Sequence, residues 1–163
     1  MKKVGIVMGS IHDYDVAKPC VEILKQFGVE VEARVISAHR TPLEAMDFAT
    51  NAKENGIEVI ISVAGKAAHL GGVIASYTTL PIIGLPVKSS LEDGIDSLYS
   101  TVQMPNGVPV ATVAINGGLN AGLLAIQILA LKYKDLEEKL VKYKNDMRCS
   151  VNGDNDKLQE LVK

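Results

Sequence analysis

The sequence is poor in the residues that mark several specialised protein classes. It has no tryptophan, 4% aromatic residues and two cysteines among 163 residues. Cys20 and Cys149 lie far apart and lack the spacing of zinc ligands, so two reduced thiols are the simpler expectation. The formal net charge is only −2, which argues against nucleic acid or an anionic membrane as a partner.

Long hydrophobic runs are also missing. The basic start Met1-Lys2-Lys3 is followed by an apolar run that stops at Gly9, which is too short for a secretory signal. The longest apolar stretch, around residues 119–131, falls short of the roughly 20 residues that cross a bilayer. These features predict a soluble cytoplasmic protein without a membrane partner.

Aliphatic residues are abundant, because 47% of the chain is hydrophobic although aromatics are few. A chain of 163 residues is expected to form one domain with a substantial core. Five short runs are rich in β-branched residues and nearly continuous rather than alternating, which predicts strands buried on both faces. These runs are residues 4–8, 29–36, 57–64, 81–87 and 108–114.

Segments with helical periodicity separate the first runs. Residues 16–27 and 43–52 have this pattern, and Gly28 and Gly56 follow them as expected for helix C-termini. Pro19 implies that the first helix begins near Val16 or bends at the proline. The alternation predicts an α/β fold with parallel βαβ crossovers. It is followed by C-terminal helices at 120–131 and 133–147, with a short third candidate at 156–162.

Three strand-to-helix junctions carry polar side chains, at residues 8–13, 37–42 and 64–72. Because the carboxyl ends of parallel strands lie at one edge of a sheet, these junctions should meet there. At the first junction, Gly9-Ser10 lets the backbone approach a ligand, and the following helix N-terminus suits an anion. The alternative is that Ser10 or Asp13 only caps that helix.

The second junction places a histidine and an arginine side by side. The segment Thr41-Pro42-Leu43-Glu44 is interpreted as a capping box with proline in the first helical position. That corner would hold His39 and Arg40 rigidly. Arginine suits a phosphate or carboxylate, and histidine is the simplest proton carrier near neutral pH. A solvated turn is the alternative reading.

The third junction is a loop of small residues, 65–72, around His69. It could form a pocket wall or only allow close packing of a helix on a strand, and Lys66 could add a charge for a phosphate or be solvated. The small residues 116–122 leave a similar choice between a fourth wall and a packing device. His12, His39 and His69 lack the spacing of metal ligands, so no metal is expected.

Several motifs together resemble the 5-(carboxyamino)imidazole ribonucleotide mutase family, from Val4 to about Lys144. They are Val7-Met8-Gly9-Ser10 with Asp13, Ser37-Ala38-His39-Arg40-Thr41-Pro42, Ala67-Ala68-His69-Leu70, Asp96-Ser97-Leu98-Tyr99-Ser100 and Gln103-Met104-Pro105. The resemblance implies a flavodoxin-like three-layer α/β/α sandwich with a parallel sheet plus C-terminal helices. It also implies a homo-octamer without metal or organic cofactor. Residues 1–163 would form one catalytic domain whose C-terminal helices, about 120–163, pack on neighbouring subunits.

The resemblance further implies an isomerase of de novo purine biosynthesis acting on a phosphoribosyl-imidazole. It would convert 5-(carboxyamino)imidazole ribonucleotide to 5-amino-1-(5-phosphoribosyl)imidazole-4-carboxylate by decarboxylation and recarboxylation. His39 matches the general acid/base of the family. The substrate-binding residues expected from these motifs are Gly9, Ser10, Asp13, Ser37, Ala38, Arg40, Gly65, Lys66, Ala68, His69 and Leu70, and Asn120 matches a pocket-lining segment.

The chain also departs from the family pattern. His12 stands where a second serine is common, Lys66 where glycine is common, and Gly71 where proline is common. A sister class carboxylates aminoimidazole ribonucleotide directly; it tends to have lysine at position 40, a basic residue near 66 and no histidine at 69. Arg40 and His69 therefore favour the mutase, while Lys66 leans toward the carboxylase. A non-catalytic nucleotide-binding module is the other alternative, and His39 argues against it.

Overall fold

The computed structural model describes residues 2–163, apart from the side chain of Glu92. Its centre is one sheet with the strand order β2-β1-β3-β4-β5, in which every pairing is parallel. This is the flavodoxin-like order, so the predicted fold class is confirmed. The strands are β1 (Lys3–Met8), β2 (Glu30–Val35), β3 (Val59–Gly65), β4 (Ile82–Val87) and β5 (Ala111–Thr112).

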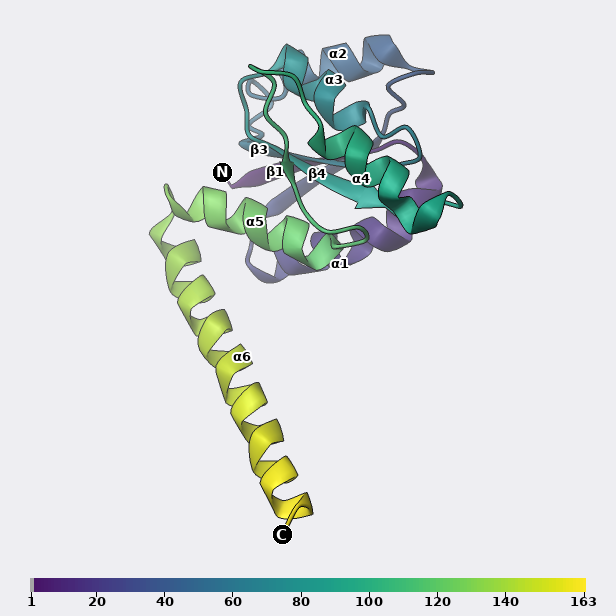
Figure 1. Cartoon of the computed structure of the whole chain (residues 1–163). Coiled ribbons are helices and arrows are strands. Elements are labelled where there is room, and N and C mark those ends of the chain that lie inside the picture. Colours follow the sequence, from purple (N-terminus) through teal and green to yellow (C-terminus); the bar gives the residue numbers. More distant parts are fainter. Residues whose placement is uncertain (1) are drawn as a thin grey trace.

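Helices cover both faces of the sheet, which gives the three layers (Figure 1). One face carries α1 (Tyr14–Gln26) and α5 (Gly118–Ala130), which pack on each other. The other carries α2 (Pro42–Asn51), α3 (Leu70–Tyr77) and α4 (Ile95–Val102). Two short 3-10 helices, η1 (Ile11–Asp13) and η2 (Glu92–Gly94), precede α1 and α4. Each face has its own cluster of buried aliphatic side chains.

The central strands are buried as predicted, but the two edge strands differ from the prediction. Nearly every side chain of β1, β3 and β4 is buried, whereas β2 is mostly exposed. The prediction of a fully buried strand at 29–36 is therefore wrong: an edge strand has a neighbour on one side only, and Glu32 and Arg34 pair there at 3.1 Å. The predicted strand at 108–114 shrinks to the two paired residues of β5. Pro109, which has no N–H to donate, lies just before them.

The first two helices end as the sequence predicts. Gly28 and Gly56 have left-handed φ values of 77° and 79°, which glycine adopts without steric cost. Helix α1 begins at Tyr14, close to the first of the two alternatives raised by Pro19, and Pro19 lies inside it at an exposed position.

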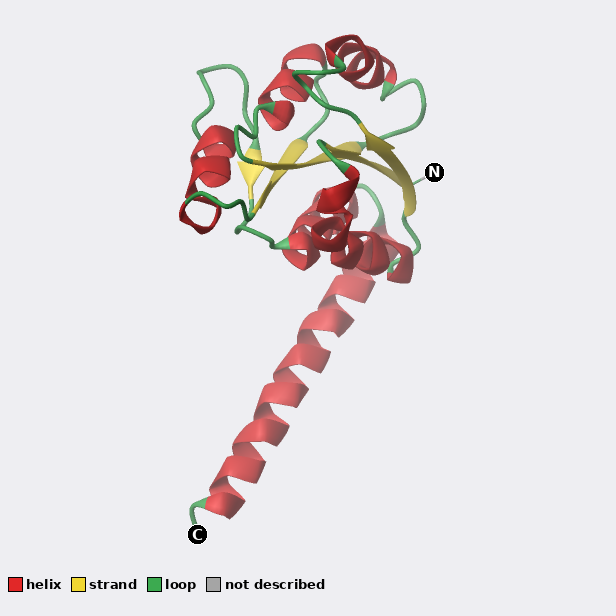
Figure 2. Cartoon of the chain, turned by 90° about the vertical axis from the view of Figure 1, so that its right-hand side faces the viewer, coloured by secondary structure: helices red, strands yellow, loops and turns green. Residues whose placement is uncertain are grey.

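The C-terminal region forms one helix, α6 (Lys134–Leu161), of 28 residues. The prediction of separate helices at 133–147 and 156–162 is wrong. The helix continues through residues 148–155, where no proline interrupts it. Ion pairs between side chains three or four residues apart also support it, such as Lys142 with Asp146 at 2.6 Å. The helix packs on the rest of the protein near its start and then extends away from it (Figures 1 and 2). No helix in the described residues is both long enough and apolar enough to span a membrane.

Candidate active site

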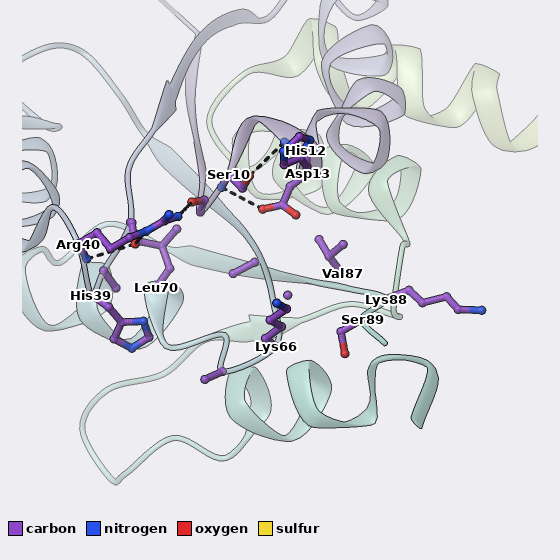
Figure 3. A pocket seen from close by; sticks show the side chains of 16 residues that line it. Ser10, His12, Asp13, His39, Arg40, Lys66, Leu70, Val87, Lys88 and Ser89 are labelled. Atoms are coloured by element: carbon purple, nitrogen blue, oxygen red, sulfur yellow. Dashed lines mark hydrogen bonds between the residues drawn. The ribbon is translucent and has the colours of Figure 1, made fainter. Parts of the chain in front are cut away.

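The ends of β1, β2, β3 and β4 meet around a cavity of about 570 Å³ at the topological switch point of the sheet (Figure 3). Ten of the twelve predicted site residues line it: Gly9, Ser10, Asp13, Ser37, Ala38, His39, Arg40, Gly65, Lys66 and Leu70. The expectation that the three junctions meet is therefore confirmed. Whether each residue touches substrate stays a prediction.

The loop after β1 is held by reciprocal hydrogen bonds. The hydroxyl of Ser10 accepts from the backbone N–H of His12 at 3.2 Å, and the backbone N–H of Ser10 donates to Oδ2 of Asp13 at 3.1 Å. Burial raises the pKa of the Asp13 carboxyl, and the bond from Ser10 opposes that shift. Ser10 therefore caps η1 and also lines the cavity, so its capping role does not exclude the predicted contact with substrate.

The loop after β2 is closed by a threonine. Thr41 Oγ1 accepts from the backbone N–H of Ser37 at 2.9 Å and donates to its carbonyl oxygen at 3.1 Å. Thr41 makes no side-chain cap bond to α2, so the predicted capping box with Glu44 is wrong. The Thr41 hydroxyl bonds the backbone of Ser37 in the turn instead of the backbone N–H groups of α2. Pro42 does occupy the first turn of the helix, as predicted.

Arg40 bridges two of the loops. Its Nε donates to Ser37 Oγ at 3.3 Å, and one terminal nitrogen donates to the carbonyl oxygen of Gly9 at 3.4 Å. These bonds hold the guanidinium along the cavity wall, where Figure 3 shows it reaching toward the Gly9-Ser10 turn. The remaining guanidinium donors are available to an anion.

His39 lies at the cavity edge and contacts a second histidine. Its Nε2 is 2.9 Å from Nδ1 of His69, and the two rings meet edge to face with centroids 5.1 Å apart. His69 does not line the cavity; it occupies the N-cap position of α3. Ala68 also lies outside the lining, and it is almost fully buried. Direct contact of Ala68 or His69 with substrate stays a prediction.

The loop after β3 contributes Lys66, which is exposed and has a left-handed φ of 55°. Lysine is uncommon in this conformation, which glycine adopts freely. The backbone at this position is therefore the one that the common glycine of the family would favour.

The end of β4 supplies lining residues that sequence reasoning missed. Lys88 and Ser89 line the cavity and directly follow this strand, so the rule that identified the other three junctions could have found them. The Lys88 side chain points away from the cavity (Figure 3) and pairs with Asp93 at 2.8 Å. The remaining lining residues that were not predicted as site residues are His12, Ala64, Ala67 and Val87.

The segment 116–122 is a packing device rather than a cavity wall. A Cβ atom on Gly118 would overlap the carbonyl oxygen of Val16, and one on Gly122 would overlap Ile23. These glycines let α5 lie close against α1, and neither they nor Asn120 line the cavity. Asn116 has a structural role, because its Oδ1 accepts from the backbone N–H of Lys88 at 2.8 Å.

The charges around the cavity favour an anion. Among the lining residues that the structure describes, Arg40 and Lys66 carry positive charge and Asp13 is the one carboxylate, while the charge of Lys88 is paired with Asp93. Within the described residues, no three His, Cys, Asp or Glu side chains are grouped so as to hold a metal ion. The fold and this cavity define a flavodoxin-like α/β protein with an anion-suited, histidine-bearing site at the switch point.

Comparison with known proteins gives the family. Residues 3–150 match the model of the AIR carboxylase family, and the chain belongs to that family. The N5-carboxyaminoimidazole ribonucleotide mutase of Saccharolobus solfataricus is 58% identical over 151 residues, covering 93% of this chain and 96% of that protein. The enzyme of the same name from Thermotoga maritima is 52% identical over 161 residues, covering 99% and 94%. Among solved structures, PurE from Treponema denticola superposes with a TM-score of 0.87 at 28% identity, covering 97% of this chain and 99% of that one. The resemblance inferred from the motifs is confirmed.

Proposed function

We propose that this protein is an isomerase of purine biosynthesis that converts 5-(carboxyamino)imidazole ribonucleotide to 5-amino-1-(5-phosphoribosyl)imidazole-4-carboxylate. The observation that carries the proposal is the position of His39 beside Arg40 in the cavity, in a chain 58% identical to a relative named as this mutase. An acid/base group beside an anion-binding group is what moving a carboxylate on a phosphorylated substrate needs.

The reaction moves a carboxylate from the exocyclic nitrogen to ring carbon 4. His39 gives a proton to the exocyclic nitrogen as the nitrogen–carboxylate bond breaks, which releases carbon dioxide inside the cavity. Ring carbon 4 then forms a bond to the carbon dioxide, and its proton returns to His39. One histidine serves both steps without net proton exchange. The small residues Gly65 and Ala67 leave room for carbon dioxide beside the imidazole ring.

Arg40 and the Gly9-Ser10 turn hold the ribose phosphate in this proposal. Arg40 is already oriented by Ser37 and Gly9, so little side-chain freedom is lost when it binds an anion. Lys66 adds positive charge at the rim. With the phosphate fixed, the imidazole end of the substrate is directed toward His39.

The active form that we propose is a cytoplasmic homo-octamer in which residues 1–163 act as one catalytic domain. The support is apolar surface: α6 exposes Met147 at 55%, Val151 at 68% and Leu161 at 83%. An amphipathic helix that extends beyond its own fold needs a partner surface, and a neighbouring subunit supplies one in a closed assembly. The number eight comes from the family resemblance. Light scattering that gave a monomer or dimer at micromolar concentration would contradict this assembly.

A substrate comparison tests the function. Purified protein is supplied either with the carbamate substrate or with aminoimidazole ribonucleotide and bicarbonate, and His39→Asn serves as the control for contaminating activity. The expected result is efficient turnover of the carbamate substrate. Efficient turnover of the second mixture alone would instead assign the direct carboxylase, and turnover of neither would favour a binding module.

A further inference from the structure

The contact between His39 and His69 joins two loops that lie 30 residues apart in the chain. A separation of 2.9 Å between Nε2 of His39 and Nδ1 of His69 is a hydrogen bond, in which one nitrogen donates and the other accepts. His69 makes no side-chain cap bond to α3, although it occupies the N-cap position. Helix capping therefore does not account for the orientation of its ring.

We propose that His69 is a positioning residue that keeps a hydrogen on Nε2 of His39, so that Nδ1 of His39 carries the proton to and from the substrate. The proposal rests on the acid/base role proposed for His39. His39 lines the cavity and His69 does not. Because Nε2 is engaged by His69, Nδ1 is the ring nitrogen left for a ligand.

The protons balance along the proposed cycle. In its acid form, His39 has a hydrogen on each nitrogen: Nε2–H donates to the lone pair on Nδ1 of His69, and Nδ1–H is available to the substrate. When Nδ1 has given its proton to the exocyclic nitrogen, His39 is neutral with its hydrogen on Nε2 and a lone pair on Nδ1. That lone pair takes the proton of ring carbon 4 after the carbon dioxide has been captured. His69 stays neutral throughout, with its own hydrogen on Nε2.

The hydrogen bond matters because neutral imidazole has two tautomers. If the hydrogen moved to Nδ1, His39 would present a donor to the substrate and could not take the proton from carbon 4. The bond also becomes stronger when His39 is charged, so it stabilises the acid form. A buried carboxylate orients the histidine of a serine protease by the same logic. Here a neutral imidazole would do so without adding negative charge beside an anionic substrate.

Three variants of His69 separate this role from a structural one. Asparagine places a carbonyl oxygen near the position of Nδ1, glutamine is one methylene longer and places it beyond, and leucine has no acceptor. We expect His69→Leu to lower kcat by about 10- to 100-fold, the value of one hydrogen bond to a charged group, with KM changed by less than about threefold. His69→Asn should restore most of kcat, whereas His69→Gln should not. Because His69 is exposed and does not cap α3, all three should keep the wild-type circular dichroism spectrum.

Nitrogen-15 NMR of the imidazole rings, without substrate, reads the tautomer directly. In the wild-type protein the neutral form of His39 should be protonated at Nε2, and in His69→Leu both tautomers should appear. The proposal is overturned if wild-type His39 carries its hydrogen on Nδ1, if kcat of His69→Leu stays within threefold of wild type, or if Asn and Gln variants have equal kcat. If the wild-type protein shows the expected tautomer but does not convert the carbamate substrate, the proposed function fails while the pairing stands.

Discussion

Replacing Lys66 by glycine should raise stability and change activity little. Lys66 has a φ of 55°, and the left-handed region costs a residue with a Cβ atom about 1–2 kcal/mol. Glycine removes that cost but gives the unfolded chain more freedom, which offsets about 0.4–1 kcal/mol. The expected gain in the free energy of unfolding is therefore up to about 1.5 kcal/mol. Lys66→Met is the matched control, because it removes the charge and keeps the strained backbone.

Both variants should alter substrate binding by a similar, small amount. Lys66 is exposed, and an exposed charge pair contributes at most about 1 kcal/mol. We therefore expect KM to rise by less than about tenfold in both, kcat to stay nearly unchanged, and the salt dependence of KM to weaken. Rim charges act mainly on the encounter with a charged ligand rather than on the chemical step.

The assay combines steady-state kinetics with denaturant unfolding of both variants at one protein concentration, since assembly adds to apparent stability. A collapse of kcat in both variants would place the Lys66 ammonium in the chemistry and reopen the carboxylase reading. Equal stability of the glycine and methionine variants would refute the reasoning from backbone strain.

Three further predictions concern stability and thiol chemistry. Burial raises the pKa of Asp13, so the folded protein holds this proton more tightly than the unfolded chain. The contribution of this carboxyl to the free energy of unfolding should therefore fall as pH rises from about 4 through its folded pKa. Asp13→Asn should lose this part of the pH dependence when unfolding curves of both proteins are measured at several pH values. The same pH dependence in both proteins would contradict the prediction. Gly118→Ala should cost about 1–3 kcal/mol because its Cβ meets a backbone carbonyl. Gly153→Ala is the control, because a Cβ atom at this position meets open space, and it should leave stability unchanged or raise it. If both variants changed the free energy of unfolding equally in chemical denaturation, the packing role of Gly118 would be refuted. Burial raises the pKa of Cys20 to about 12, so it should resist iodoacetamide in the native protein, and mass spectrometry showing rapid labelling would contradict its burial.

The fold was largely predictable because the buried strands appear in the sequence as continuous aliphatic runs. The exposure of β2 was missed although its own residues indicate it. Glu30, Glu32 and Arg34 occupy every second position of this strand, and charged residues at this spacing are not typical of a strand buried on both faces. The length of α6 was missed because asparagine and glycine near 152–155 usually interrupt helices, yet no competing contact acts on them here.

The site was predictable to the level of the loops and less so to the level of side-chain contacts. Strand ends and charge located His39 and Arg40, and applying the same rule to β4 would have found Lys88. The hydrogen bonds between Thr41 and Ser37 were not predicted, because the same sequence allows the threonine hydroxyl to bond either the preceding turn or the N-terminus of the following helix. The pairing of His39 with His69 depends on how two loops face each other, which sequence spacing does not record.

The measurement that tests the central claim most directly compares binding and turnover in His39→Asn and Arg40→Ala. Asparagine keeps a polar planar group but exchanges no proton near neutral pH, so product binding by calorimetric titration should persist. Turnover should fall by about 10⁴-fold or more, the upper end for proton-transfer groups, because one histidine serves two steps. Arg40→Ala should instead weaken product binding by about 10- to 150-fold, since charge-assisted hydrogen bonds are each worth roughly 1.5–3 kcal/mol. If His39→Asn turned over within tenfold of wild type, His39 would not be the acid/base.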